Sequence, residues 1–464
     1  MKNNFKIYDV IVAGAGIAGS EAALFCAKSG LKTLIINISM DNPAFLRYSS
    51  KIGGKIKASL LKEINILGGF LQRAADRNKI AVKMEREGSV LSPACIVDKR
   101  NLSLFYKLYI ENQDNLFTRQ GLVTEIKKIN KDQKRKYEII LNDGSIFYCK
   151  KIIIAAGTFL NGKTLWGKNI ISAGRFGEIA SESLGRSLKS IGYDFVKCRT
   201  FISPRIDKKT VKLKVVKKIK SDDFDNVCFD DSKNQEENIQ KEKYFCYRSN
   251  VSKKIIKNTL SELKTEIIMD TAEIGKKSNS NILIEEAIEN YKMENFINLF
   301  LFPEGTNTQE LYAEGFFSIL SEDFQQKLLN RFLGMENAVL TRPGYCIEYN
   351  CLKSGQLKST LESIENEGMY FAGDINGPSE YEAASAQGVV AGINTSLNIL
   401  KNTDLVFDKD KTLTGFIIKN INSFNINPLS DLIYLKAAGF KNYKFEETET
   451  MMTACRDKLK EVGL

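Results

Sequence analysis

The segment Tyr8–Gly19, YDVIVAGAGIAG, joins a short apolar run to three glycines spaced Gly-x-Gly-x-x-Gly. The apolar run predicts a buried parallel strand, and the residues up to Ser29 follow a helical pattern that Gly30 ends. Leu31–Ile36 is the next predicted strand. The sequence therefore predicts a βαβ unit at the start of the chain, with the glycines at the turn between strand and helix.

Glycines at this turn are typical of a dinucleotide site. The first permits a tight turn, the second lets the backbone approach a pyrophosphate, and the third lets the helix pack on the strand. The helix N-terminus adds amide donors and a positive dipole. Where an acidic residue usually holds the ribose, this chain has Asn37, whose amide can also bond a hydroxyl. The alternative is a glycine-rich turn without a ligand.

A second signal for a cofactor is Gly373-Asp374, between a predicted strand over Met369–Ala372 and a predicted helix over Tyr381–Leu400. The carboxylate can accept a hydrogen bond from a ribityl hydroxyl, and the alternative is an ordinary Asp helix cap. Upstream, three alternating strands and one buried strand form a predicted β-meander. These strands are Leu122–Ile129, Tyr137–Leu141, Ile146–Cys149 and Lys151–Ala156. The layout is typical of flavoproteins, so FAD is the expected cofactor.

The amino-acid composition limits the classes of protein and of active site that are compatible with this sequence. The 464 residues suggest two to three domains, and 43% hydrophobic and 27% charged residues are ordinary for a folded protein. No apolar run approaches a membrane span, and the chain enters a strand by Ile7 without a leader, so we expect no membrane segment and a cytoplasmic protein. Histidine is absent and no CxxC pair occurs, which excludes histidine-dependent triads and makes a metal site unexpected. Nine cysteines without regular spacing fit a reducing compartment.

The net charge of +11 permits a nucleic-acid partner without requiring one. Seven lysines lie in 208–220, and a polar, acidic stretch follows. We predict that 208–243 is an exposed, weakly ordered insertion, and we favour a solvated loop over an RNA contact for its lysines.

Six ordered blocks resemble the glucose-inhibited division protein A family, the FAD subunit of the tRNA wobble-uridine 5-carboxymethylaminomethyl enzyme. The resemblance covers about 400 residues, from Gly14 to Gly388. The blocks are Gly157–Lys163, Ser203–Asp207, Pro303–Gly305, Arg342–Tyr349, Phe371–Gly377 and Tyr381–Gly388.

The resemblance implies chemistry on tRNA. In that family NADH reduces FAD, and the flavin carries a one-carbon unit from methylene-tetrahydrofolate to C5 of the wobble uridine, with a GTPase partner. A homodimer is also implied. The implied nicotinamide segment lies near Gly275. The implied FAD contacts are Gly14, Ala15, Gly16, Ile17, Ala18 and Gly19 at the pyrophosphate, Val123 on the adenine side, and Ser181 and Asp374.

Several departures from the family concern its catalytic apparatus. At one family cysteine this chain has Tyr48-Ser49-Ser50, and the region of the second reads GKKSNSNILIE, without a thiol. Thiolates suit addition to a pyrimidine ring. The sequence also ends at Leu464, before the family's helical domain that docks tRNA and the GTPase, so that partner is in doubt. The chain could therefore be a catalytically impaired paralogue that binds FAD or RNA, or a flavin oxidoreductase acting on a small molecule.

Residues that could replace the missing thiols are few. Cys346 and Lys163 are weak catalytic candidates, and Cys346 can equally be a small buried hydrophobe. Lys163, Arg205 and Arg342 could bind phosphate or flavin, or the arginines could be partners in structural ion pairs.

The predicted fold is α/β, a discontinuous Rossmann-like FAD-binding domain with an inserted α+β domain. We place the FAD-binding domain at 1–200 and 335–400, the insertion at 201–334, and a short, mostly helical tail at 401–464.

Overall fold

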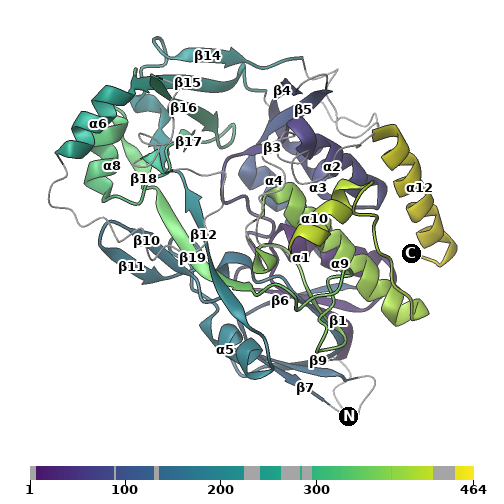
Figure 1. The fold of residues 1–464 in the computed structure, drawn as a ribbon. Helices are drawn as coiled ribbons and strands as arrows, with labels where there is room; N and C mark the ends of the chain where they lie inside the picture. The colour runs from purple at the N-terminus through teal and green to yellow at the C-terminus, as the bar shows by residue number, and fades with distance from the viewer. Residues whose placement is uncertain are drawn as a thin grey trace.

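A computed structural model gives the fold of the chain (Figure 1). It describes residues 7–87, 90–129, 135–223, 241–262, 283–284, 295–377, 379–421 and 445–464.

The central sheet has the strand order β6-β2-β1-β9-β8-β7, and β20 pairs with the second half of β9, beyond the part that pairs with β8. Strands β1, β2, β6, β9 and β20 run parallel, whereas β7, β8 and β9 form an antiparallel meander. Because β1 lies between β2 and β9, its carboxyl end opens at the middle of the sheet, where ligands of doubly wound folds bind. The strands are β1 (Ile7–Ala13), β2 (Thr33–Asn37), β6 (Leu116–Gln120), β7 (Val123–Lys128), β8 (Tyr137–Leu141), β9 (Ile146–Ile154) and β20 (Met369–Phe371).

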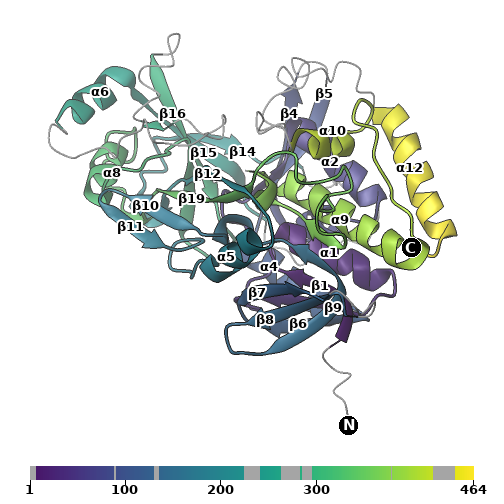
Figure 2. The ribbon, with the colours of Figure 1, turned by 60° about the horizontal axis from the view of Figure 1, so that its bottom comes forward.

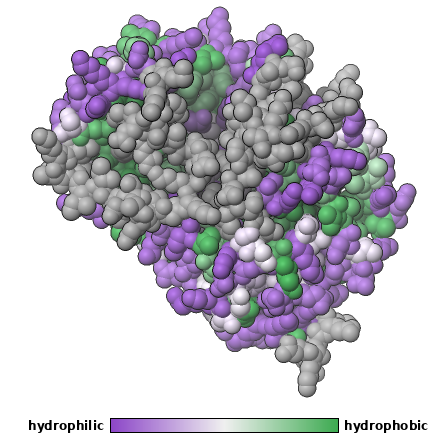
Figure 3. Space-filling model, viewed as in Figure 1, coloured by the Kyte–Doolittle hydropathy of each residue, from purple (hydrophilic) through white to green (hydrophobic). Residues whose placement is uncertain are grey.

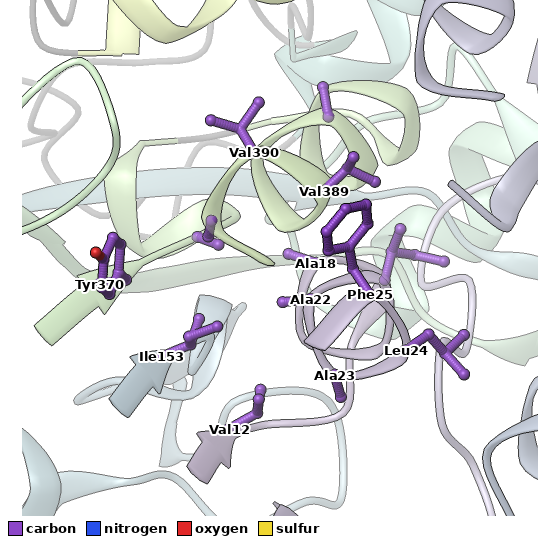
Figure 4. Close-up of a cluster of buried hydrophobic side chains, with 14 of the residues drawn as sticks. Val12, Ala18, Ala22, Ala23, Leu24, Phe25, Ile153, Tyr370, Val389 and Val390 are labelled. Carbon is purple, nitrogen blue, oxygen red and sulfur yellow. The ribbon is translucent and has the colours of Figure 1, made fainter. Parts of the chain in front are cut away.

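Helix α1 (Ile17–Lys28) packs between this sheet and α9 (Tyr381–Lys401). Figure 4 shows Ala22 and Ala23 of α1 above the sheet residues Val12 and Ile153, with Val389 of α9 on the far side of α1. All five of these side chains are buried. Small residues on α1 let the two helices approach closely, which seats the glycine turn firmly on the core.

Three smaller sheets stand beside the central one. A six-stranded sheet, β14-β15-β16-β17-β13-β18, carries α6 (Lys253–Ser261) and α8 (Glu322–Leu329) and lies away from α9 and α12 (Figures 1 and 2). Its strands are β14 (Lys217–Lys220), β15 (Tyr244–Ser252), β16 (Phe296–Pro303), β17 (Glu310–Glu314), β13 (Arg205–Asp207) and β18 (Leu340–Arg342). The four-stranded sheet comprises β11 (Asn169–Ser172), β10 (Lys163–Trp166), β19 (Tyr345–Leu352) and β12 (Phe195–Ile202). The three-stranded sheet comprises β3 (Lys51–Gly53), β5 (Val90–Val97) and β4 (Lys79–Glu87).

The remaining helices in the part of the chain that the structure describes, like those named above, lack the length and hydropathy of a membrane-spanning segment. Among these residues, no helix is long and apolar enough to cross a membrane. The visible face is mostly hydrophilic where it is coloured, with scattered hydrophobic side chains (Figure 3). These helices are α2 (Lys55–Ile66), α3 (Leu71–Asn78), α4 (Lys99–Glu111), α5 (Glu182–Ser190), α10 (Leu413–Ile421) and α12 (Phe445–Glu461).

Two local predictions were wrong. The segments 146–149 and 151–156 are a single strand, β9, because its first half pairs with β8 and its second half lies between β1 and β20. The lysine-rich stretch is not a loop at 217–220, since these residues form the edge strand β14 on β15. Residues 224–240 of the predicted insertion lie outside the described residues. The proposed domain limits at 200, 334 and 400 stay predictions.

Candidate functional site

The turn between β1 and α1 contains three glycines, and a side chain at each of them would have a different effect. Gly14 has φ +107°, and a Cβ there would lie 2.4 Å from the carbonyl oxygen of Ala155. A Cβ on Gly19 would lie 1.9 Å from the carbonyl oxygen of Gly14. A Cβ on Gly16 would meet nothing within 4 Å. Gly14 and Gly19 are therefore required by packing, whereas Gly16 keeps a space in front of the helix N-terminus open.

That space belongs to a cavity at the carboxyl end of the central sheet, the first cavity. Eight of the nine predicted FAD contacts line it, and the ninth, Gly19, packs behind the turn. The eight are Gly14, Ala15, Gly16, Ile17, Ala18, Val123, Ser181 and Asp374. Residues separated by up to 360 positions thus meet around one space.

Asn37, at the end of β2, orders the turn. Its side-chain oxygen accepts a hydrogen bond from the backbone N–H of Ala15 at 3.1 Å, and its amide nitrogen donates to the carbonyl of Ser39 at 2.6 Å. Asn37 also lines the first cavity. The amide therefore fixes the glycine turn at the edge of the first cavity.

Asp374 lies at the opposite wall, in the short helical turn after β20. Gly373 has φ +85°, which turns the chain sharply after the strand. The Asp374 carboxylate forms an ion pair with Arg47 and accepts a hydrogen bond from the backbone N–H of Ser379 at 3.1 Å. Asp374 is thus a buried acid already held in place, not a helix cap of α9, whose N-cap is Glu380.

The first cavity fits an adenine dinucleotide such as FAD. The N-terminus of α1 supplies a positive dipole next to open space at Gly16, which suits a pyrophosphate. Arg47 lines the cavity, and its Nε is buried without a hydrogen-bond partner. A buried, unused donor in this wall is what an anionic or hydroxyl-rich ligand would satisfy.

A second cavity of about 580 Å³ adjoins the first. Asn42, Phe45, Arg47, Arg175 and Glu178 line both. Four element ends meet at the second cavity: the start of α4, the end of β16, the start of β13 and the end of β18. They contribute Lys99, Glu304, Arg205 and Arg342, respectively.

The floor of the second cavity is a buried ionic cluster. Lys99 Nζ donates to Glu304 and to the backbone carbonyl of Tyr48, and Arg205 Nε lies 3.4 Å from Glu304 Oε1. Burial lowers the pKa of Lys99 to about 7, although Glu304 acts in the opposite direction. Burial alone would raise the pKa of Glu304, but Lys99 and Arg205 hold it below its usual range. Glu304 therefore contacts both Lys99 and Arg205, and the net charge of the cluster depends on whether Lys99 is protonated.

The two weak catalytic candidates lie elsewhere. Lys163 is exposed on β10 opposite Glu348, and Cys346 is buried with Leu165, Phe201 and Phe317. Neither lines either cavity. Nothing in these surroundings points to a catalytic role for them.

The side chains at the position of the first missing family thiol form hydrogen bonds with neighbouring residues of the chain. The Tyr48 hydroxyl hydrogen-bonds Thr200, and Ser50 Oγ donates to the carbonyl of Pro303. The stretch around Gly275, with the predicted nicotinamide segment, lies outside the described residues except for 283–284. Within the described parts of the chain, no thiol lines either cavity.

Sequence reasoning missed three residues of this site. Arg47 stands directly before the Tyr48 block, Glu304 is the centre of Pro303–Gly305, and Lys99 precedes Arg100. The block around Glu304 was visible as a motif, but only the fold shows that its carboxylate reaches Lys99, 205 positions away.

A parallel sheet with a glycine turn at its centre, a meander, and a return strand followed by Asp374 define a flavoprotein of the Rossmann-like class. Residues 9–403 match the family described as Glucose inhibited division protein A. The chain belongs to this family.

Individual proteins of this family are similar to the chain in sequence and in structure. The tRNA uridine 5-carboxymethylaminomethyl modification enzyme MnmG of Lachnoclostridium phytofermentans is 32% identical over 91% of this chain and 67% of its own length. The enzyme of the same name from Thermodesulfovibrio yellowstonii is 35% identical over 90% of this chain and 66% of its own. Aquifex aeolicus GidA superposes with a TM-score of 0.85 at 26% identity, covering 99% of this chain and 74% of that one. The chain thus spans about two thirds of the length of the curated relatives it matches.

Proposed function

We propose that the chain takes part in FAD-dependent modification of the wobble uridine of tRNA. The observation that carries the proposal is the first cavity, where the glycine turn, Val123, Ser181 and Asp374 line one space in a member of this family. The named relatives modify tRNA uridine to the 5-carboxymethylaminomethyl form, and their alignments cover 91% and 90% of this chain and 67% and 66% of their own lengths.

In this proposal the first cavity holds FAD. The Gly14–Gly19 turn binds the pyrophosphate through backbone amides, Val123 contacts the adenine side, and Asp374 accepts from a ribityl hydroxyl while Arg47 fixes it. Bound FAD supplies two-electron redox chemistry and, by resemblance, one-carbon transfer from methylene-tetrahydrofolate after reduction by NADH. A homodimer and a GTPase partner belong to the same proposal, as does the division into an FAD-binding domain (1–200 and 335–400), an inserted domain (201–334) and a tail (401–464).

A second candidate function is a catalytically impaired paralogue that binds FAD or RNA without completing the reaction. It is favoured by Tyr48 at the position of a family thiol and by the lack of a thiol on either cavity within the described residues. The two candidates differ in whether a modified uridine is formed on tRNA.

Nucleoside mass spectrometry of total tRNA separates them. We expect deletion of the gene to remove a modified wobble uridine, and the wild-type gene, but not a Gly16→Val version, to restore it. An unchanged nucleoside profile after deletion would reject the modifying function and favour the binding paralogue.

A further inference from the structure

Arg47 lies at the boundary of the two cavities, because it lines both of them and its guanidinium forms the ion pair with Asp374. The segment that carries Arg47, residues 38–50, joins β2 to β3 without a helix or strand of its own. Helical or strand hydrogen bonds therefore do not set the position of this guanidinium. Contacts with other parts of the chain have to set it.

Two buried cations bond the backbone of this segment. Arg205 Nη2, on β13, donates to the carbonyl of Arg47 at 2.9 Å. Lys99 Nζ, at the start of α4, donates to the carbonyl of Tyr48. Both cations meet the Glu304 carboxylate, which Lys99 contacts directly and which lies 3.4 Å from Arg205 Nε. One carboxylate thus orients the two donors that bond consecutive backbone carbonyls.

Lys99, Arg205 and Glu304, the Glu304 cluster, are closed off from solvent. Their side chains are 2%, 6% and 8% exposed, respectively. The ring of Tyr312 covers one side, 4.8 Å from the Arg205 guanidinium and 5.5 Å from Lys99 Nζ. If the two backbone carbonyls moved away, buried charged donors would lose acceptors, which costs free energy. The cluster therefore resists displacement of the segment.

Two further side chains extend these contacts along the segment. The Tyr381 hydroxyl accepts from the backbone N–H of Tyr48 at 2.6 Å and donates to the carbonyl of Ser49 at 3.2 Å. Ser50 Oγ donates to the carbonyl of Pro303 at 2.5 Å. Each residue from 47 to 50 is thus hydrogen-bonded to an element that is distant in the sequence.

We propose that Arg205 is a positioning residue for the dinucleotide site, because with Lys99 and Glu304 it fixes the backbone from which Arg47 reaches Asp374. Arg205 does not line the first cavity, so its effect on that cavity passes through Arg47. The six-stranded sheet, which carries Arg205 on β13, thereby sets how tightly the first cavity holds FAD. This inference rests on the proposed function, since it takes FAD as the ligand of the first cavity.

Arg205→Met is the test variant. It removes the donor to the Arg47 carbonyl and leaves one ammonium opposite one carboxylate in the Glu304 cluster. In a fluorescence titration we expect FAD to bind about tenfold more weakly, and Arg205→Lys to restore part of the affinity, since an ammonium can still donate. Arg248→Met is the matched control. Arg248 lies on β15 of the same sheet, donates to the side chain of Asn298 and lines neither cavity, so FAD affinity should stay at the wild-type value.

A double-variant cycle separates positioning from a general loss of stability. In Arg47→Met protein the ion pair with Asp374 is already absent, so adding Arg205→Met should weaken FAD by about twofold or less. A tenfold loss in both backgrounds would overturn the proposal, because Arg205 would then act without Arg47. Equal FAD affinity in wild type and Arg205→Met would overturn it as well.

Hydrogen exchange of the cofactor-free protein measures the same positioning without FAD. Peptides that contain the Tyr48 amide should exchange faster in Arg205→Met, whereas Arg248→Met should match wild type. Ser50→Ala is the second variant and decides the question if Arg205→Met does not fold, since it removes only the hydroxyl bonded to Pro303. Unchanged exchange in both Arg205→Met and Ser50→Ala would overturn the proposal. Faster exchange in variants of a protein that binds no FAD would support the positioning role and reject FAD as the ligand, so the two failures are distinguishable.

Discussion

Gly16 and Gly19 differ in what an added side chain would meet. Substitutions at these two positions therefore test flavin binding and protein stability separately. Gly16→Val adds methyl groups to open space, so we expect a folded protein that no longer retains flavin. Gly19→Val forces a Cβ against the Gly14 carbonyl, so we expect a loss of stability of about 2 kcal/mol or more. Urea unfolding and flavin absorbance measured on both variants check this. Wild-type flavin retention by Gly16→Val would contradict the assignment.

Asp374 pairs with Arg47, and in the proposed function it also accepts a hydrogen bond from FAD. Asp374→Ala should weaken FAD by about 1–3 kcal/mol, because a carboxylate acceptor is lost, and should also lower the free energy of unfolding, because Arg47 loses its partner. Fluorescence titration with FAD and urea unfolding measure the two effects separately.

The double variant Arg47→Met, Asp374→Ala is the control. It removes the unpaired charge, so stability should return in part while the FAD affinity stays low. If FAD binds Asp374→Ala as tightly as wild type, Asp374 does not hold the cofactor.

Four buried cysteines are predicted to be poor nucleophiles in the folded protein. Burial raises the pKa of Cys26 and Cys246 to about 12 and raises the pKa of Cys95 and Cys351 as well. A raised thiol pKa leaves the neutral, unreactive form dominant at pH 7.5, and the thiolate fraction grows only as the pH approaches these values.

Iodoacetamide labelling with peptide mapping should therefore modify only half-buried Cys455, and that slowly, among the cysteines of the described residues at pH 7.5. Labelling in urea shows that every thiol is competent. Rapid labelling of Cys346 in the folded protein would contradict this and would restore it as a catalytic candidate.

At the scale of elements, Glu63 on α2 holds the start of α10. Its buried carboxylate accepts from the N–H groups of Leu413 and Thr414, each at 2.9 Å, and from the Thr414 hydroxyl at 2.8 Å. Glu63→Gln replaces one acceptor oxygen with a donor, so we expect α10 to open more readily by about 1–3 kcal/mol.

Hydrogen exchange of the amides of 413–421 measures this opening. Glu111→Gln, at the exposed end of α4, is the control and should leave exchange in α10 unchanged. Unchanged protection of α10 in Glu63→Gln would show that apolar packing alone holds the helix.

Elements with a strong local pattern were predictable from the sequence. The glycine turn, the meander and α9 follow directly from apolar runs and turn residues, and the predicted strand over Tyr137–Leu141 matches β8. The prediction divided strand β9 at the polar residue Lys150, between Ile146–Cys149 and Lys151–Ala156. Pairing on both sides keeps it continuous, and this tertiary pairing is invisible to a local pattern.

At the scale of the whole molecule, the first cavity was predictable and the second was not. Motifs of known spacing identify the residues that line the first cavity. The second depends on contacts such as Lys99 with Glu304 and Arg47 with Asp374, separated by 205 and 327 positions. No spacing rule connects such residues, and only the meeting of α4, β13, β16 and β18 brings the cations together.

The measurement that tests the central claim most directly is the absorbance spectrum of the purified protein before and after anaerobic addition of NADH. We expect a bound-flavin spectrum that NADH bleaches, because the proposed function places FAD in the first cavity and uses NADH as its reductant. Folded protein that shows no bound flavin, even after FAD is added, would contradict the assignment of the first cavity as an FAD site. Bound flavin that NADH does not bleach would contradict NADH as the reductant.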